Sequence, residues 1–112
     1  MIITVKLALA LICLPDQCHH ALVGKNTVPG RYRLQRRYVA SPGYGGDVLV
    51  YRETPSWIMA IHRVWTLKPS QRREERLASN DPADRQSITD GCINVSPEVY
   101  DLIPPDAELI IE

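Results

Sequence analysis

The chain has 112 residues, of which 45% are hydrophobic and 23% charged, close to the average of globular proteins. Its 13 basic and 13 acidic residues give a formal net charge of +0, so no overall field favours nucleic acid or an anionic membrane as a partner. Length and composition exclude a disordered, collagen-like or coiled-coil chain and predict a single domain spanning residues 1–112. Because Phe is absent, we expect Trp57, Trp65 and the five tyrosines to supply the large rings of the core.

Residues 1–22 allow two interpretations. Lys6 is followed by eight apolar residues, Leu7 to Leu14, which is similar to a short signal peptide, although no small-x-small cleavage site follows. The same Ile, Val and Leu content fits a buried first strand that stops at Pro15. The apolar run is too short to cross a bilayer as a helix. We favour the strand over the leader.

The three cysteines cannot all pair within one chain. In an oxidising compartment Cys13 and Cys18 could form a disulfide and leave Cys92 as a free thiol. Cys13 and Cys18 could instead join His19 and His20 in a zinc site. Adjacent histidines rarely reach one metal ion and the cysteine spacing is wide, so we favour a loop without metal.

A turn at Thr27-Val-Pro-Gly-Arg-Tyr32 is expected to lead into a strand, because Pro29 restricts φ and Gly30 permits a tight reversal. After it, apolar and polar residues alternate with the period of a half-buried strand that runs to Tyr38. The polar face is rich in arginine. The arginines of this segment are Arg31, Arg33, Arg36 and Arg37. They could bind phosphate, but we favour the interpretation that they form a solvated face of the strand or protect a sheet edge by their charge.

The strongest strand signal is Trp57-Ile-Met-Ala-Ile-His-Arg-Val64, and a shorter strand is expected over Asp47–Tyr51. Alternation places Trp57, Met59 and Ile61 on one face, and His62 ends the apolar row on the other. A lone histidine there is either a hydrogen-bonded core residue or a functional group.

The charged stretch from Leu67 to Gln86 predicts a segment that runs over the surface of the domain, either as a flap or as a solvated insertion. We expect a short helix in it, capped by Ser70.

The stretch Ser87-Ile-Thr-Asp-Gly-Cys-Ile-Asn-Val-Ser-Pro is the most informative part of the sequence. Gly91 permits a strained backbone that could present the Cys92 thiol to a ligand. Ser96 and Pro97 predict the start of a helix just beyond it. A thiol with a pKa of about 8.5 is mostly protonated at pH 7, so a nucleophilic Cys92 needs a base such as His62. The alternative is a buried structural cysteine.

The run Thr89-Asp-Gly-Cys-Ile-Asn94, with His62 upstream, resembles the signature of the L,D-transpeptidase (YkuD-type) catalytic domain. The turn at residues 27–32 and the closing segment Pro104-Pro-Asp-Ala-Glu-Leu-Ile-Ile-Glu112 resemble the first turn and last strand of that domain, so the resemblance covers residues 24–112. Three features depart from the pattern. Asp90 replaces a histidine, Arg63 replaces a glycine, and 29 residues (63–91) separate His62 from Cys92. A proteobacterial subgroup with a long insertion and a Gly-Cys-Ile-Asn-Val run shares such features.

The resemblance implies a mainly β fold, a small β-sandwich with one or two short helices, and a place in the periplasm or cell envelope. It implies action on peptidoglycan stem peptides without a metal or organic cofactor. We also expect a monomer, and the charge balance and the short apolar run lead us to expect neither a nucleic-acid partner nor a membrane span. The acyl acceptor stays open between a stem peptide, a protein lysine and water.

The resemblance also assigns roles to the residues of the motif. Cys92 would be the nucleophile and His62 its base, and the backbone N–H groups of Gly91 and Cys92 would stabilise the oxyanion. Thr89 would orient the site or contact the substrate, and Asn94 would brace the nucleophile turn. Arg63 and Arg85 could meet substrate carboxylates, but exposed arginines are usually solvated, so we leave them out of the site.

Two alternative functions remain. One is a secreted antibacterial effector that modifies a competitor's wall by the same chemistry, which the small size and the doubtful leader motivate. The other is a wall-binding module that has lost catalysis, which Asp90 and the short front of the domain motivate.

Overall fold

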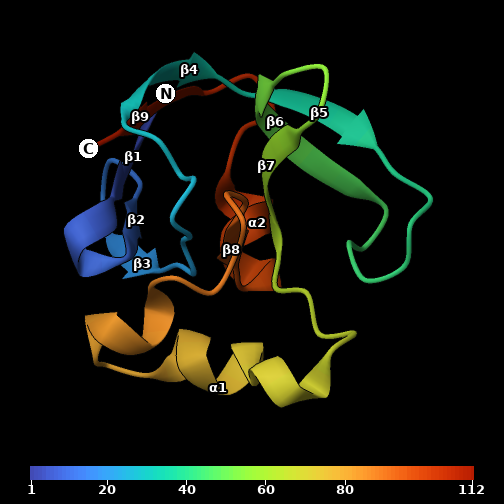
Figure 1. Cartoon of the computed structure of the whole chain (residues 1–112). Helices are drawn as coiled ribbons and strands as arrows, with labels where there is room; N and C mark the ends of the chain where they lie inside the picture. The colour runs from blue at the N-terminus through green and yellow to red at the C-terminus, as the bar shows by residue number, and fades with distance from the viewer.

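A computed structural model describes residues 1–112 as a mainly β domain with two sheets and two short α-helices (Figure 1). One sheet has five strands in the order β3-β2-β1-β9-β4, and the other has four in the order β5-β6-β7-β8. The strands are β1 (Ile2–Lys6), β2 (Leu11–Cys13), β3 (Cys18–His20), β4 (Gly30–Arg33), β5 (Gln35–Tyr38), β6 (Asp47–Glu53), β7 (Ile58–Arg63), β8 (Ile93–Val95) and β9 (Glu108–Ile111). The fold class expected from the sequence is therefore confirmed.

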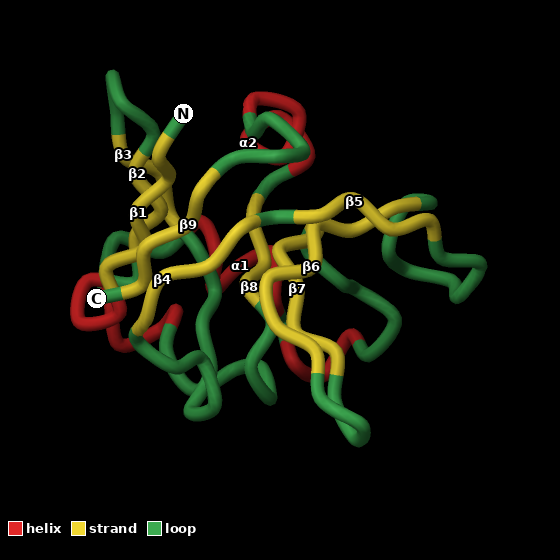
Figure 2. The backbone as a smooth tube through the Cα atoms, turned by 90° about the horizontal axis from the view of Figure 1, so that it is seen from above, coloured by secondary structure: helices red, strands yellow, loops and turns green.

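The two sheets lie side by side, with the helix α2 (Pro97–Leu102) between them (Figures 1 and 2). The main core is a cluster of 20 buried hydrophobic residues that come from both sheets, from α2 and from the segments that connect them. The first and last strands, β1 and β9, pair in parallel, and so do β7 and β8; the other pairs are antiparallel. The β7–β8 pair matters most here, because it brings the His62 and Cys92 segments together.

The N-terminal segment forms three strands where the sequence predicts one. Ala10 adopts a left-handed backbone (φ 49°) after the short 3-10 helix η1 (Leu7–Leu9), and this reverses the chain between β1 and β2. Cys13 and Cys18 face each other across β2 and β3 and form a disulfide, which confirms the predicted pairing. Because both sulfurs are in that bond, neither can serve as a thiolate ligand, and the zinc alternative fails.

The expected single strand over residues 31–38 is wrong. The chain leaves the first sheet after β4 and enters the second as β5, and Leu34, between them, is only 2% exposed. The alternation ends there, and Tyr38 is 78% exposed. The arginines of this region are engaged by acceptors within the chain, as expected for a charged edge: Arg31 pairs with Glu108, Arg36 with Asp47 and Arg37 with Glu53, and Arg33 donates to the Asp106 carbonyl.

The predicted faces of β7 are confirmed. Met59 and Ile61 enter the main core, and Ala60 packs on the other face against Val48 and Val50. The expectation that Trp57 is a core ring is wrong, because it lies at the exposed end of the β6–β7 hairpin and is 52% exposed. Trp65, beyond the end of β7, is half-buried.

The polar stretch forms the 3-10 helices η2 (Pro69–Gln71) and η3 (Pro82–Arg85) and the helix α1 (Arg73–Ala78), which runs below both sheets in Figure 1. Ser70 does not cap α1. The N-cap is Arg72, in a left-handed conformation (φ 54°). Ser96 does cap α2 as predicted, since its hydroxyl accepts a hydrogen bond from the Val99 N–H at 3.2 Å.

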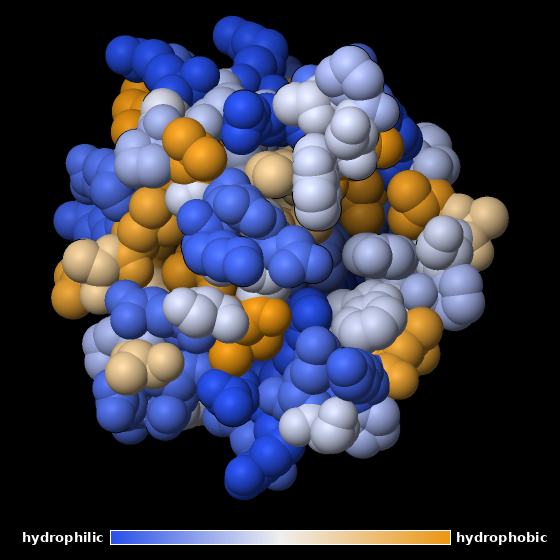
Figure 3. Space-filling model, viewed as in Figure 1, coloured by the Kyte–Doolittle hydropathy of each residue, from blue (hydrophilic) through white to orange (hydrophobic).

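Neither α-helix has the length and apolar character that a membrane span requires. On the face shown in Figure 3, hydrophobic side chains occur in small groups among hydrophilic ones.

Candidate active site

Cys92 lies at a corner just before β8 and is the free thiol of the chain. Three side chains hold the corner through its backbone. Thr89 Oγ1 donates to the Cys92 carbonyl at 2.6 Å and accepts from the Gly91 N–H at 3.2 Å. The Gly91 carbonyl accepts from the Tyr51 hydroxyl at 2.7 Å and from the Thr27 hydroxyl at 3.0 Å. The thiol therefore sits on a backbone segment with little freedom to move.

Gly91 cannot be replaced at this corner without strain. Its φ of +152° is rarely adopted by residues with a side chain, and a Cβ atom would lie 2.7 Å from Met59 Sδ. The glycine that the motif contains is therefore required by the turn itself.

His62 lies on β7, and its register partner on the parallel strand β8 is Asn94. Its side chain is only 3% exposed. Nδ1 lies 2.7 Å from the Arg63 carbonyl oxygen, so Nδ1 carries the proton and donates it to that carbonyl. Nε2 is left as the basic nitrogen and accepts a long hydrogen bond, of 3.5 Å, from the Asn94 side-chain Nδ2–H.

Cys92 and His62 line the same cavity, which has a volume of about 170 Å³. Continuing the register by one residue from the Ile61–Ile93 pair places Cys92 beside Ala60, on the face that carries His62 and Asn94. The strand spacing and rise put the Cα atoms of such diagonal neighbours about 8 Å apart. No hydrogen bond joins the two side chains, and the thiol donates instead to the Ile58 carbonyl at 3.9 Å.

Several lining residues of this cavity were not predicted from the sequence. The aromatic residues come from three separate segments, and the two charged side chains, Arg73 and Asp90, come from α1 and from the corner that carries Cys92. The lining residues beyond Cys92 and His62 are Tyr44, Trp57, Met59, Trp65, Arg73, Thr89, Asp90 and Gly91.

Burial keeps both reactive groups neutral at pH 7. The pKa of His62 is lowered to about 4, mainly by desolvation; the bond to the Arg63 carbonyl opposes this shift, and the nearby positive charge of Arg73 adds to it. Desolvation raises the pKa of the Cys92 thiol, and Asp90 adds to this; Ala60 and Arg73 oppose it. The resting pair is therefore a thiol and a neutral imidazole, not a thiolate–imidazolium ion pair.

The other predicted residues have these positions. Thr89 is buried and bonds only to the backbone of the corner. The Asn94 side chain lies against His62 rather than against the nucleophile turn. The Gly91 N–H is occupied by Thr89, whereas the Cys92 N–H has no partner within the protein.

Arg85 and Arg63 stabilise the fold. Arg85 is 2% exposed and donates to the carbonyls of Leu9, Ala10 and Ser79, which ties η3 to the N-terminal strands. The expectation that it is exposed is wrong. Arg63 pairs with Asp47 and stacks on the Tyr100 ring at 4.1 Å.

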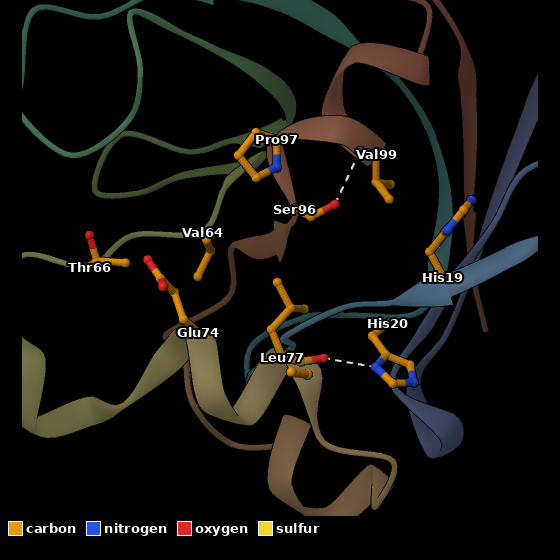
Figure 4. Close-up of a pocket in the computed structure, with 10 residues that line it drawn as sticks. His19, His20, Val64, Thr66, Glu74, Leu77, Ser96, Pro97 and Val99 are labelled. Atoms are coloured by element: carbon orange, nitrogen blue, oxygen red, sulfur yellow. Dashed lines mark hydrogen bonds between the residues drawn. The ribbon is translucent and has the colours of Figure 1, made fainter.

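A larger cavity, of about 580 Å³, lies elsewhere, between β3, α1 and α2 (Figure 4). Its walls include Val64, Leu77 and Val99, and His20 donates to the Leu77 carbonyl at its edge. Neither Cys92 nor His62 lines it. The smaller cavity is therefore the candidate active site, because it alone combines a free thiol with a base.

No family model matches this chain, and neither a curated protein nor a solved structure does. The resemblance to L,D-transpeptidases thus depends on the motif residues themselves and remains a prediction.

Proposed function

We propose that the protein is a cysteine acyl transferase that acts on peptidoglycan stem peptides through a thioester on Cys92. The observation that carries this proposal is the free Cys92 thiol and the neutral, oriented His62 imidazole lining one cavity. A nucleophile, a base and a third group that fixes the base form the general arrangement for covalent catalysis. Here the third group is the Arg63 carbonyl, which holds the Nδ1 proton.

In the first step, the Cys92 side chain rotates away from the Ile58 carbonyl toward His62, where the thiol replaces the Asn94 N–H as the donor to Nε2. Nε2 takes the thiol proton as Sγ attacks the carbonyl carbon of the donor's L,D peptide bond. The C–N bond then breaks, and the proton passes from Nε2 to the leaving amine. The donor is left as a thioester on Cys92.

In the second step, an amine or a water molecule attacks the thioester carbonyl. His62 takes a proton from the attacking group and returns it to the sulfur as the C–S bond breaks. An amine acceptor gives a new amide, and water gives a shortened peptide. Burial disfavours both the Cys92 thiolate and the His62 imidazolium. The proton therefore leaves the thiol while the sulfur attacks the substrate carbonyl, and not before.

The oxyanion that forms in both steps needs a hydrogen-bond donor. The Cys92 N–H has no partner in the protein, so it can serve, whereas the Gly91 N–H is held by Thr89. One such donor typically contributes about 3 kcal/mol to the stability of the transition state. The hydrogen bonds of Tyr51 and Thr27 to the Gly91 carbonyl support this role, because that carbonyl and the Cys92 N–H share one peptide plane. Thr89 holds the two neighbouring peptide planes.

The choice of substrate rests on the resemblance of residues 89–94 to the L,D-transpeptidase signature, and the cavity is compatible with it. A volume of about 170 Å³ is below that of most small-molecule sites. A cavity of this size suits the terminal residue of a peptide substrate more than a bulky ligand.

Product analysis tests this proposal. The protein is incubated with a stem tetrapeptide that ends in an L,D bond, with and without an added amine. We expect release of the terminal amino acid together with the tripeptide or its amine conjugate. Cys92→Ala should give no product, and His62→Gln should lower the rate by about 100-fold or more.

Product from Cys92→Ala at the wild-type rate would contradict the proposal, and so would a lack of product from wild-type protein whose Cys92 is reduced. Retention on insoluble peptidoglycan by both proteins without turnover would support the non-catalytic module instead.

A further inference from the structure

Arg73, the first residue of α1, reaches the cavity from the long segment between His62 and Cys92. Two acceptors fix its guanidinium: Gln71 Oε1 accepts from Nε–H at 2.8 Å and Asn94 Oδ1 accepts from Nη1–H at 3.0 Å. Its charge lies over the Trp65 ring at 5.1 Å. The side chain is thus held in one orientation before any ligand binds.

Arg73 is the only lysine or arginine that lines the Cys92 cavity, and it has no ion pair. Its remaining N–H groups have no acceptor in the protein. Asp90 is the other charged lining residue, but it is exposed and makes no salt bridge with Arg73. Asp90 acts on Arg73 only through the electrostatic field. A partly desolvated guanidinium with free N–H groups and no salt-bridge partner is suited to a planar anion, which it can bind with two parallel hydrogen bonds.

We propose that Arg73 binds the C-terminal carboxylate of the acyl donor and so places the last peptide bond of the donor at Cys92. This inference rests on the proposed function. Arg73 and Cys92 line the same cavity. In a peptide donor the terminal carboxylate lies one residue, about 3.5 Å, beyond the carbonyl carbon of the last peptide bond, so one small cavity can hold both groups. The leaving group is then a free amino acid, whose amine takes the proton that His62 received from the thiol.

Arg73 also touches Asn94, which touches His62, so a purely structural role must be separated from carboxylate binding. A structural role changes the rate for every donor alike. Carboxylate binding changes only the preference between a donor with a free C-terminus and one whose C-terminus is neutral. The preference is therefore the decisive quantity.

The experiment compares a stem tetrapeptide with the same peptide amidated at its C-terminus, and measures kcat/KM for thioester-dependent turnover of each. Wild-type protein should prefer the free acid by about tenfold or more. Arg73→Gln should abolish most of this preference, and Arg73→Lys should keep part of it, because lysine retains the charge but not the planar pair of donors. Arg72→Gln is the matched control, since Arg72 pairs with Glu75 outside the cavity and its loss should leave the preference intact.

Equal turnover of acid and amide by the wild type would overturn the inference while leaving the proposed function in place. An equal loss on both donors in Arg73→Gln would also overturn it and assign Arg73 a positioning role. If the wild type turns over neither donor and Cys92 gains no acyl group, the proposed function itself fails and this inference fails with it.

Discussion

The Asn94 side-chain nitrogen lies 3.5 Å from Nε2 of His62, at the centre of the β7–β8 pair. The amide oxygen of the same side chain accepts hydrogen bonds from the Arg73 guanidinium and from the backbone N–H of Trp65. These bonds orient the amide so that its nitrogen faces the imidazole. The protonation state of His62 should therefore respond directly to a charge at position 94.

Asn94→Asp tests this contact. A carboxylate beside the imidazole favours the charged form, so the pKa of His62 should rise from about 4 toward its ordinary value. An NMR titration of the histidine ring protons measures this shift. Asn80→Asp is the control, because Asn80 is exposed and outside the cavity. An unchanged His62 titration in the first variant would show that the contact is absent in solution.

The low pKa of His62 also predicts how stability depends on pH. The unfolded chain takes up a proton near the ordinary histidine pKa of 6.5, whereas the folded protein takes it up only near 4. Stability is therefore fully present above pH 6.5 and is lost as the pH falls toward 4, by about 3 kcal/mol. Urea unfolding at a series of pH values measures this loss. His62→Gln should flatten the curve over that window, and an equal slope in both proteins would contradict the assignment.

Thr89 is predicted to hold the nucleophile corner. Thr89→Val keeps the shape of the side chain but leaves the Cys92 carbonyl and the Gly91 N–H without their partner. We expect a loss of about 2 kcal/mol in the free energy of unfolding, measured by urea denaturation, and a lower rate of Cys92 acylation. Thr89→Ser retains the hydroxyl and should recover most of both. If Thr89→Val matched the wild type, the corner would not depend on this side chain.

The reactivity of the thiol should follow the two charges that line the cavity. Asp90 raises the pKa of Cys92 and Arg73 lowers it. Asp90→Asn should therefore increase the rate of alkylation by iodoacetamide at pH 8 by about twofold, and Arg73→Gln should decrease it. Asp101→Asn is the control, because Asp101 is exposed on α2, away from the cavity. A slower reaction in Asp90→Asn would contradict the proposed electrostatics.

Local patterns predicted those parts of the fold that depend on neighbouring residues. The faces of β7, the Ser96 cap of α2 and the Cys13–Cys18 bridge each follow from residues close in sequence. The strand expected through Leu34 failed because alternation cannot show that a chain changes sheets. Arg36 interrupts the apolar row two residues after Leu34. In the structure Leu34 packs into the core where the chain passes from one sheet to the other.

The site was predicted only where the motif contains it. His62, Cys92 and Gly91 carry recognisable chemistry, and the structure brings them to one cavity. Arg73 was missed because it lies in a run of charged residues, where no local feature separates it from Arg72. Its place depends on contacts with Asn94 and Trp65, which are distant in sequence.

The mass of the intact protein after brief incubation with a stem tetrapeptide tests the central claim most directly. Wild-type protein should gain the mass of the peptide less its terminal amino acid, and peptide mapping should place the adduct on Cys92. Cys92→Ala should gain nothing under the same conditions. A wild-type protein that stays unmodified with its thiol reduced, or an adduct that maps to another residue, would contradict the assignment of Cys92 as the nucleophile.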